Sequence, residues 1–272
     1  MSMIACSIVD LDDNPDASKW YLETHVPRVV AKLGGTAYSA SKMEENVFPD
    51  MASIEGQYIT RYELPEGTDA KAAESHISTT SEKLPLSAKI ETRMYERQET
   101  WYGEGWRGHI RDIQFFQMAF WQTSEAVRDD FVGWLRDDFF PNMADSPELI
   151  RMSIFKLKHA SISQNGNTEQ MNPENMYQYM GVWELIFLPN EGRSPTLLFR
   201  RHFFLDETPA NFTFFLARLD NDEVPWDALV YLGTSEKWRM YWEAGQVQWQ
   251  ARAYHVNRFH PEEKRKDSPT TR

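Results

Sequence analysis

A histidine within residues 20–27 is the side chain best placed for proton-transfer chemistry. The stretch reads Trp-Tyr-Leu-Glu-Thr-His-Val-Pro, and its apolar residues at helical spacing predict an amphipathic helix. Near the apolar face of that helix, His25 can act as a general base or acid, because imidazole changes charge near neutral pH. The structural alternative is a histidine at the helix surface or end that bonds a backbone carbonyl. Glu23 and His25 are two residues apart, so they do not share a helix face as metal ligands would.

Tyrosine and arginine side chains on two predicted strands could assist such a histidine. Strand alternation places Tyr58, Thr60 and Tyr62 on one face of their strand. Arg93 and Tyr95 share a face of a later strand and can join the same site. Tyrosine and arginine polarise carbonyl groups and stabilise enolates. We therefore expect Tyr62, Arg93 and Tyr95 to be catalytic and Tyr58 to bind substrate, whereas cross-strand packing and surface ion pairing are the structural alternative.

The stretch 20–27 recurs 114 residues later at 134–141, where the sequence reads Trp-Leu-Arg-Asp-Asp-Phe-Phe-Pro (134 − 20 = 114). The tryptophan, an acidic residue three positions on and the proline seven positions on are all repeated. Phe139, however, stands where the first copy has His25. Self-similarity of this kind indicates an internal duplication, and the single difference suggests that the copies differ in proton chemistry.

Further matches extend the repeat and supply candidates in the second copy. Residues 57–64 match 178–185, and Arg93-Met94-Tyr95 matches Arg252-Ala253-Tyr254. The substrate-binding candidates in the second copy are Trp183, His202, Tyr254 and His255. His255 alternates to the opposite strand face from its neighbour. Two readings stay open: the second copy is a scaffold, or the larger aromatic second copy holds the ligand and the first copy is the scaffold.

The pattern of predicted elements gives an α+β fold of two β-α-β-β-α-β units. We expect the first unit at 1–105, the second at 106–260 with an aromatic insertion at about 189–222, and a disordered tail at 261–272. In the first unit, strands are predicted at 3–9, 36–43, 57–64 and 89–96, with helices at 16–33 and 69–77. In the second, strands are predicted at 113–121, 149–158, 177–188 and 247–256, with helices at 126–143 and 235–243. Asp16 or Ser18 is expected to cap the first helix, and 161–175 to form a loop.

This order, with a first helix that reads Trp-Tyr-x-x-x-His-x-Pro, resembles the dimeric α/β-barrel superfamily and within it the EthD-like branch. The resemblance implies two ferredoxin-like units that pair their sheets into a barrel, here within one chain. It implies a pocket between sheet and helices, and His25 matches the motif histidine. Members include cofactor-free monooxygenases, polyketide cyclases, isomerases, decarboxylases, dehydratases and haem proteins. The fold therefore does not settle the reaction.

Composition narrows the partners. A net charge of −12 argues against nucleic acid and anionic membranes. No apolar run is long enough to span a bilayer, the N-terminus lacks the features of a signal peptide, and the single Cys6 cannot form an intramolecular disulfide. We expect a cytoplasmic protein that binds a small apolar molecule and could form a homodimer.

The sequence contains none of the common phosphate, dinucleotide, zinc or serine-hydrolase motifs. No spacing among its 7 histidines selects a haem ligand, so we expect no metal and no cofactor. The leading hypothesis is a cofactor-independent enzyme that acts on a polyketide- or terpenoid-like metabolite by cyclisation, isomerisation or elimination. A pericyclic step in a shaped cavity is included. The alternatives are a cofactor-free monooxygenase and a non-catalytic module that binds an apolar ligand or haem.

Overall fold

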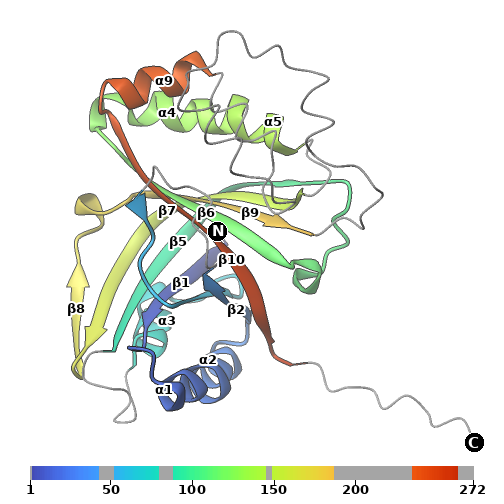
Figure 1. Cartoon of the computed structure of the whole chain (residues 1–272), viewed down its shortest axis with the longest axis vertical. Coiled ribbons are helices and arrows are strands. Elements are labelled where there is room, and N and C mark those ends of the chain that lie inside the picture. The colour runs from blue at the N-terminus through green and yellow to red at the C-terminus, as the bar shows by residue number, and fades with distance from the viewer. Residues whose placement is uncertain (1, 43–51, 80–87, 145–148, 187–234, 263–272) are drawn as a thin grey trace, which may run out of the picture.

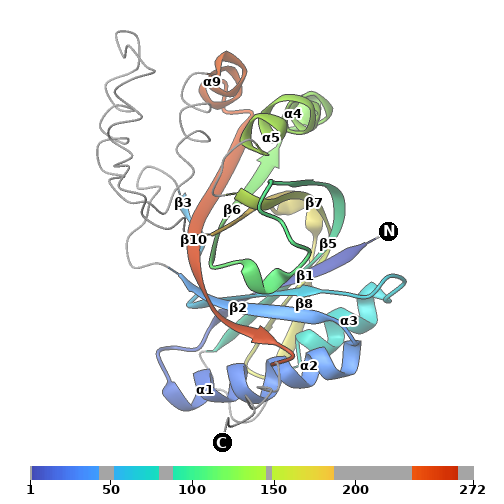
Figure 2. The ribbon, with the colours of Figure 1, turned by 90° about the vertical axis from the view of Figure 1, so that its right-hand side faces the viewer.

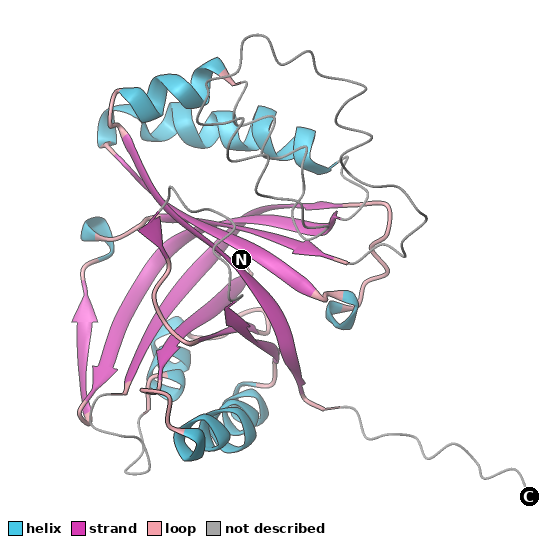
Figure 3. Ribbon diagram, viewed as in Figure 1, coloured by secondary structure: helices cyan, strands magenta, loops and turns pink. Residues whose placement is uncertain are grey.

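The computed structural model describes residues 2–42, 52–79, 88–144, 149–186 and 235–262. They form a β-barrel between two layers of helices (Figure 1, Figure 3). The predicted insertion at 189–222, with His202, lies outside the described residues, as does most of the predicted tail at 261–272. Among the helices that are described, none has the length and apolar character needed to cross a bilayer.

The first half contains five strands and one long helical segment. Its elements are β1 (Met3–Asp10), α1 (Pro15–Trp20), a π-helix (Tyr21–His25), α2 (Val26–Leu33), β2 (Thr36–Lys42), β3 (Ala52–Ser53), β4 (Tyr58–Glu63), α3 (Ala70–Ile77) and β5 (Lys89–Tyr102). The cap of α1 is Asn14, whose side chain accepts hydrogen bonds from two backbone N–H groups. The predicted caps Asp16 and Ser18 are therefore wrong. Gly34 ends α2 with a φ of 75°, a left-handed conformation that glycine adopts without strain.

The second half follows a similar order. Its elements are β6 (Phe115–Thr123), α4 (Arg128–Trp134), a π-helix (Leu135–Phe139), α5 (Phe140–Ala144), β7 (Leu149–Gln164), β8 (Asn167–Met171), β9 (Tyr179–Leu185), α9 (Glu236–Glu243) and β10 (Val247–His260), with short 3-10 turns at Ile110–Asp112, Glu125–Val127 and Pro173–Asn175. The loop predicted at 161–175 is wrong, because β7 continues into it and pairs with β8. Asn165 and Gly166 have φ values of 55° and 75°, which the two-residue turn of a tight hairpin requires.

Eight antiparallel strands close the barrel. Their order is β2-β4-β1-β5-β7-β9-β6-β10, and β10 pairs back onto β2. The first four strands of this path belong to the first half and the other four to the second half. The two halves meet where β5 pairs with β7 and where β10 pairs with β2. In each case the last strand of one half pairs with the second long strand of the other. Figure 2 looks into the barrel, with α1, α2 and α3 on one side of it and α4, α5 and α9 on the other.

The two π-helices occupy equivalent places, since 135 − 21 = 114 is also the offset of the recurring stretch. A π-helical turn adds one residue per turn and is often found at functional sites. In both halves the first and last residues of the π-helix are buried, Tyr21 and His25 in one and Leu135 and Phe139 in the other. The repeated motif thus buries its second and sixth side chains in both halves.

Buried side chains form three clusters, one for each helix layer and one inside the barrel. The first helix layer includes Tyr21 and Tyr62, and the second includes Trp121, Trp134 and Trp183. The barrel interior is filled by its own side chains, as expected for eight strands. The core of the protein is therefore divided into three separate parts.

Candidate active site

The predicted catalytic residues lie on two faces of one sheet. His25 and Tyr62 are buried in the first helix layer, where Tyr58 also packs. Tyr95 points into the barrel interior, and Arg93 lies over a phenylalanine ring there. The prediction that Arg93 and Tyr95 share a site with His25 and Tyr62 is therefore wrong. The two sets form separate candidate sites, and their chemistry must be considered separately.

His25 has both ring nitrogens occupied. Its Nε2 lies 3.0 Å from the carbonyl oxygen of Ile77, to which it donates, and Arg28 donates to Nδ1 at 3.2 Å. The ring also stacks on Tyr21, with 5.4 Å between ring centroids. Burial and the Arg28 charge lower the pKa of His25 to about 4. His25 is thus a neutral imidazole that fixes the π-helix to the end of α3, which is the contact that the structural alternative predicted.

A row of hydroxyl side chains crosses five strands beneath this π-helix. In register across β2, β4, β1, β5 and β7, the row consists of Ser39, Thr60, Ser7, Thr92 and Ser161. All five side chains are fully buried. The Tyr21 hydroxyl donates to Thr60 at 3.0 Å, and Ser39 bonds the same oxygen at 2.9 Å. The row is a continuous polar strip inside an otherwise apolar layer.

Thr92 Oγ1 in this layer lacks a hydrogen bond to any described residue, whereas the hydroxyls of Tyr62 and Ser7 interact with each other and with Tyr21. Tyr62 lies close to Tyr21, and burial raises its pKa well above the ordinary value. It is therefore a neutral donor at physiological pH. A buried polar group without a partner costs free energy, so its retention in a core indicates a role other than packing.

The matching row of the second half is apolar. In the same register across β7, β9, β6 and β10 it consists of Ile154, Gly181, Ala119 and Ala251. Gly181 allows the indole of Trp121 to lie against the sheet, since a Cβ there would be 2.6 Å from that ring. Trp183, the counterpart of Tyr62, stacks on Phe140 at 5.7 Å. The second layer is thus filled with aromatic rings, and the polar strip is particular to the first.

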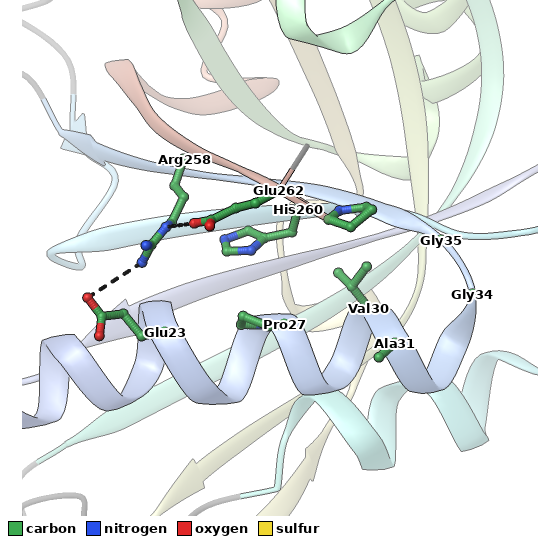
Figure 4. A pocket seen from close by; sticks show the side chains of 10 residues that line it. Glu23, Pro27, Val30, Ala31, Gly34, Gly35, Arg258, His260 and Glu262 are labelled. Carbon is green, nitrogen blue, oxygen red and sulfur yellow. Dashed lines mark hydrogen bonds and ion pairs between the residues drawn. The ribbon is translucent and has the colours of Figure 1, made fainter. Parts of the chain in front are cut away.

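The first helix layer opens into a groove at its edge. The groove has a volume of about 660 Å³, within the range of small-molecule sites. Side chains of the helical segment and of β10 face each other across it (Figure 4). Its walls are formed by Glu23, Pro27, Val30, Ala31, Gly34, Gly35, Arg258, His260, Pro261 and Glu262. One face of the repeated motif therefore lines the groove while the other covers the polar strip.

His260 is the histidine that lines the groove. It is buried, yet its Nε2 has no hydrogen-bond partner in the part of the chain that the structure describes. Burial and the nearby Arg258 charge lower the pKa of His260 to about 4, so the ring is neutral at pH 7. Arg258 itself pairs with Glu262 at 2.5 Å and with Glu23 at 3.8 Å.

Strand register connects the groove to the polar strip. His260 pairs with Ala37 on β2, and Ala37 pairs with Tyr62 on β4. Two strand spacings separate His260 from Tyr62, about 10 Å between backbones, with only a small alanine between them. Arg258 pairs likewise with Ser39, the first hydroxyl of the strip. An imidazole at the groove and a buried phenol thus lie on either side of a small residue on one face of the sheet.

The candidates of the second half do not form one site. Trp183 belongs to the second helix layer, whereas Tyr254 points into the barrel, where it stacks on Phe116 at 5.2 Å. The side chain of His255 lies on the opposite face of β10 from that of Tyr254, as strand alternation predicts. Among the described residues, no cluster of three or more potential metal ligands is present.

A buried ion cluster on the interior side of the barrel joins the two halves. Glu184 of the second half bonds Arg61 at 2.5 Å and also pairs with Arg151, which in turn bonds Glu63 of the first half at 2.9 Å. Arg97 bonds Glu63 at 2.6 Å. Every carboxylate here is matched by arginines, so we assign this cluster a structural role.

The sequence matches no family model and no curated protein. Among solved structures, an anthrone oxidase-like protein is similar, with 10% sequence identity, a TM-score of 0.50, and coverage of 95% of this chain and 92% of that one. A provisionally assigned monooxygenase from Lactobacillus acidophilus NCFM has 12% identity and a TM-score of 0.47, with 95% of both chains covered. The chain has a dimeric α/β-barrel fold. At these identities the likeness shows the fold alone.

Two parts of this α/β barrel were not identified from the sequence. His260 lies beyond the predicted end of its strand, so its burial was not expected, although a continued alternation past residue 256 was a usable signal. The hydroxyl strip was missed because its members are spread over five strands, and only pairing brings them into line. Glu91, which shares a strand face with Arg93 and Tyr95, was also missed.

Proposed function

We propose that this α/β barrel is an enzyme that removes a proton from a carbon next to a carbonyl group in a small aromatic compound. The observation that supports it is the buried hydroxyl strip of the first helix layer, which has an entirely apolar counterpart in the second layer. Both layers share one fold, so packing alone does not account for the difference. The first helix layer would hold the site, with the base His260 contributed by β10 of the second half, and the second helix layer would be the scaffold.

Substrate would enter through the groove beside α2. Pro27 and Val30 provide an apolar wall, and His260 with Arg258 a polar one. A planar ring between the helix and the sheet would pass over Ala37 toward Tyr62. The aromatic and aliphatic surroundings favour an apolar, carbonyl-bearing compound, consistent with a polyketide-like metabolite.

The reaction would begin at His260. Its free Nε2 takes the proton from the carbon, and the electron pair of the broken C–H bond moves onto the carbonyl oxygen. Tyr62 donates a hydrogen bond to that oxygen and stabilises the enolate. Return of the proton to another carbon completes an isomerisation, whereas loss of a leaving group completes an elimination. His25 holds Tyr21 and the π-helix in place rather than acting as the base.

Oxygenation without a cofactor is the second candidate. It is favoured by the shared fold with an anthrone oxidase-like protein. The enolate of an activated aromatic methylene can give one electron to dioxygen, and recombination of the radicals forms a hydroperoxide. Loss of water from the hydroperoxide leaves a new carbonyl, so that CH₂ and O₂ become C=O and H₂O. The same base and donor serve both reactions.

Descent from a duplicated unit is a further part of the proposal. The strand order of the first half recurs in the second, with equivalent π-helices, and this supports ferredoxin-like units at 1–105 and 106–260. Membership of the EthD-like branch, a cytoplasmic location, a homodimer and independence of metals and cofactors stay predictions.

The proposal is tested with anthrone as the probe. Under nitrogen in deuterium oxide, NMR measures exchange of the methylene protons, and an oxygen electrode measures uptake in air. We expect the wild-type protein to accelerate exchange, and His260→Asn and Tyr62→Phe to reduce it about tenfold or more. His109→Asn, at an exposed histidine, serves as control. Exchange no faster than in buffer, or unchanged by His260→Asn, would refute the proposal, while oxygen uptake decides between the two reactions.

A further inference from the structure

A second cavity lies at one end of the barrel, away from the first helix layer. Its volume is about 170 Å³, and cavities of about 150 Å³ in other proteins bind benzene. Its walls are formed by Ile8, Asp10, Ile54, Glu55, Gly56, Lys89, Glu91, Arg93 and Gln250. There is therefore room for one aromatic ring with a small substituent.

Arg93 is the residue of this cavity that packing does not explain. Its Nε donates to Glu91 at 2.5 Å, and its guanidinium lies 4.5 Å from the centre of the Phe120 ring. The side chain is buried, but NH1 has no hydrogen-bond partner within the described ranges. A buried guanidinium with one open N–H donor is costly unless a ligand accepts from it.

Tyr95 lies beside Arg93. It follows Arg93 on the same face of β5 and stacks parallel to Phe120, with 6.4 Å between ring centroids. Its hydroxyl interacts with the Arg93 side chain. Burial raises the pKa of Tyr95, against the opposing effect of the Arg93 charge, so the phenol keeps its proton. Tyr95 thus helps to position the guanidinium, and the open N–H of Arg93 is the donor that this cavity offers to an acceptor oxygen.

The charges around the cavity select an uncharged ligand. Glu91 already neutralises Arg93, and Lys89 lies 3.9 Å from the same carboxylate. Asp10 and Glu55 add two further carboxylates, and the described wall residues include no further cation. A ligand carboxylate would meet this negative charge, whereas a neutral carbonyl oxygen can accept the same hydrogen bonds without repulsion. Ile8 and Ile54 would contact the apolar remainder of the ligand.

We propose that this cavity binds a small uncharged aromatic carbonyl compound, whose oxygen accepts a hydrogen bond from Arg93. The site lies on the opposite face of the sheet from the groove, and it does not depend on the function proposed above. The sequence predicts that Arg93 and Tyr95 bind a carbonyl group. The proposal keeps this role for Arg93 but places it in the barrel cavity rather than beside His25.

Methyl NMR of the isoleucine-labelled full chain tests the site with two probes of equal shape. Benzamide carries a neutral carbonyl, whereas benzoate carries a carboxylate. We expect benzamide to shift the methyl signals of Ile8 and Ile54 saturably, with benzoate at least about tenfold weaker, because its carboxylate is repelled by the carboxylates of the cavity walls. Ile77 and Ile90 in the first helix layer are internal controls, so their signals should not move.

Two variants separate the donors from the fold. Arg93→Lys keeps the charge beside Glu91 but removes the open N–H, and should weaken benzamide binding about tenfold. Tyr95→Phe keeps the ring and removes only the hydroxyl beside Arg93, so the variant should fold, and binding should weaken by a smaller factor. Equal binding of benzoate, shifts confined to Ile77 and Ile90, no saturable shift at all, or unchanged affinity in both variants would each overturn the proposal.

Discussion

Replacing Thr92 by valine tests whether the hydroxyl strip is kept for function rather than for stability. The Thr92 side chain is fully buried on β5, and its Oγ1 has no hydrogen-bond partner among the described residues. Burial of a hydroxyl without a partner costs about 1–3 kcal/mol. Valine has the same shape and no hydroxyl, so Thr92→Val should raise the free energy of unfolding by about 1 kcal/mol.

Thr100 on the same strand provides the matched control. Its Oγ1 lies 2.9 Å from Ser153 Oγ in a hydrogen bond. Removal of one satisfied hydrogen bond costs about 1 kcal/mol, so Thr100→Val should lower the free energy of unfolding by that amount. The same chemical change at two positions of β5 should therefore change the free energy of unfolding in opposite directions, and the two variants should differ by about 2 kcal/mol.

Urea unfolding at pH 7, followed by tryptophan fluorescence, measures both changes. If Thr92→Val destabilises the protein as much as Thr100→Val, the Thr92 hydroxyl has a partner in solution and the reasoning is wrong. Anthrone exchange should fall in Thr92→Val if the strip contacts substrate. If Thr92→Val is more stable than wild type and keeps the full rate of anthrone exchange, the Thr92 hydroxyl contributes neither to stability nor to catalysis.

Three further predictions concern titratable groups. Burial would raise the pKa of Glu63, but three arginines lower it to about 2 from an ordinary 4.5. Glu63→Gln should therefore lower the free energy of unfolding by about 3 kcal/mol at pH 7. In urea titrations, this difference from wild type should vanish as pH falls from 4.5 through 2. Anthrone exchange should lose half its rate near pH 4, the lowered pKa of His260, and a midpoint near 6.5 would contradict the assignment. In the wild type, the free energy of unfolding should fall as pH falls from 6.5 to 4, because His25 binds a proton in the unfolded chain before it does so in the folded one. His25→Phe, which copies Phe139 of the second half, should abolish this pH-dependent loss. An unchanged pH slope in urea unfolding would count against it.

The elements of the fold could be read from the sequence because their signals are local. Alternation in 57–64 and helical spacing around the recurring stretch each depend on neighbouring residues, and the structure confirms the strand β4 and the helical segments there. The hairpin turn at Asn165 and Gly166 was missed, although this dipeptide is a strong turn signal. Its polar surroundings were read as a loop instead.

Strand pairing decided which predicted residues meet. Tyr62 pairs with Ala5, and Ala5 pairs with Met94, so Met94 rather than Tyr95 shares the face of Tyr62. A register shift of one residue moves a side chain to the opposite face of the sheet, and nothing local in β5 fixes its register against β4 two strands away. This is the physical reason why one predicted site became two.

By itself the sequence determined the amphipathic elements, the recurring motif and the replacement of His25 by Phe139, since each is a property of residues read along the chain. The tertiary structure alone decided the sites. Closure of the barrel through β2 and β10 brought His260 into line with Tyr62, and pairing of five strands aligned the hydroxyls beneath the π-helix. Burial and hydrogen bonding, which depend on those long-range contacts, made His25 a neutral anchor and left His260 free to take a proton.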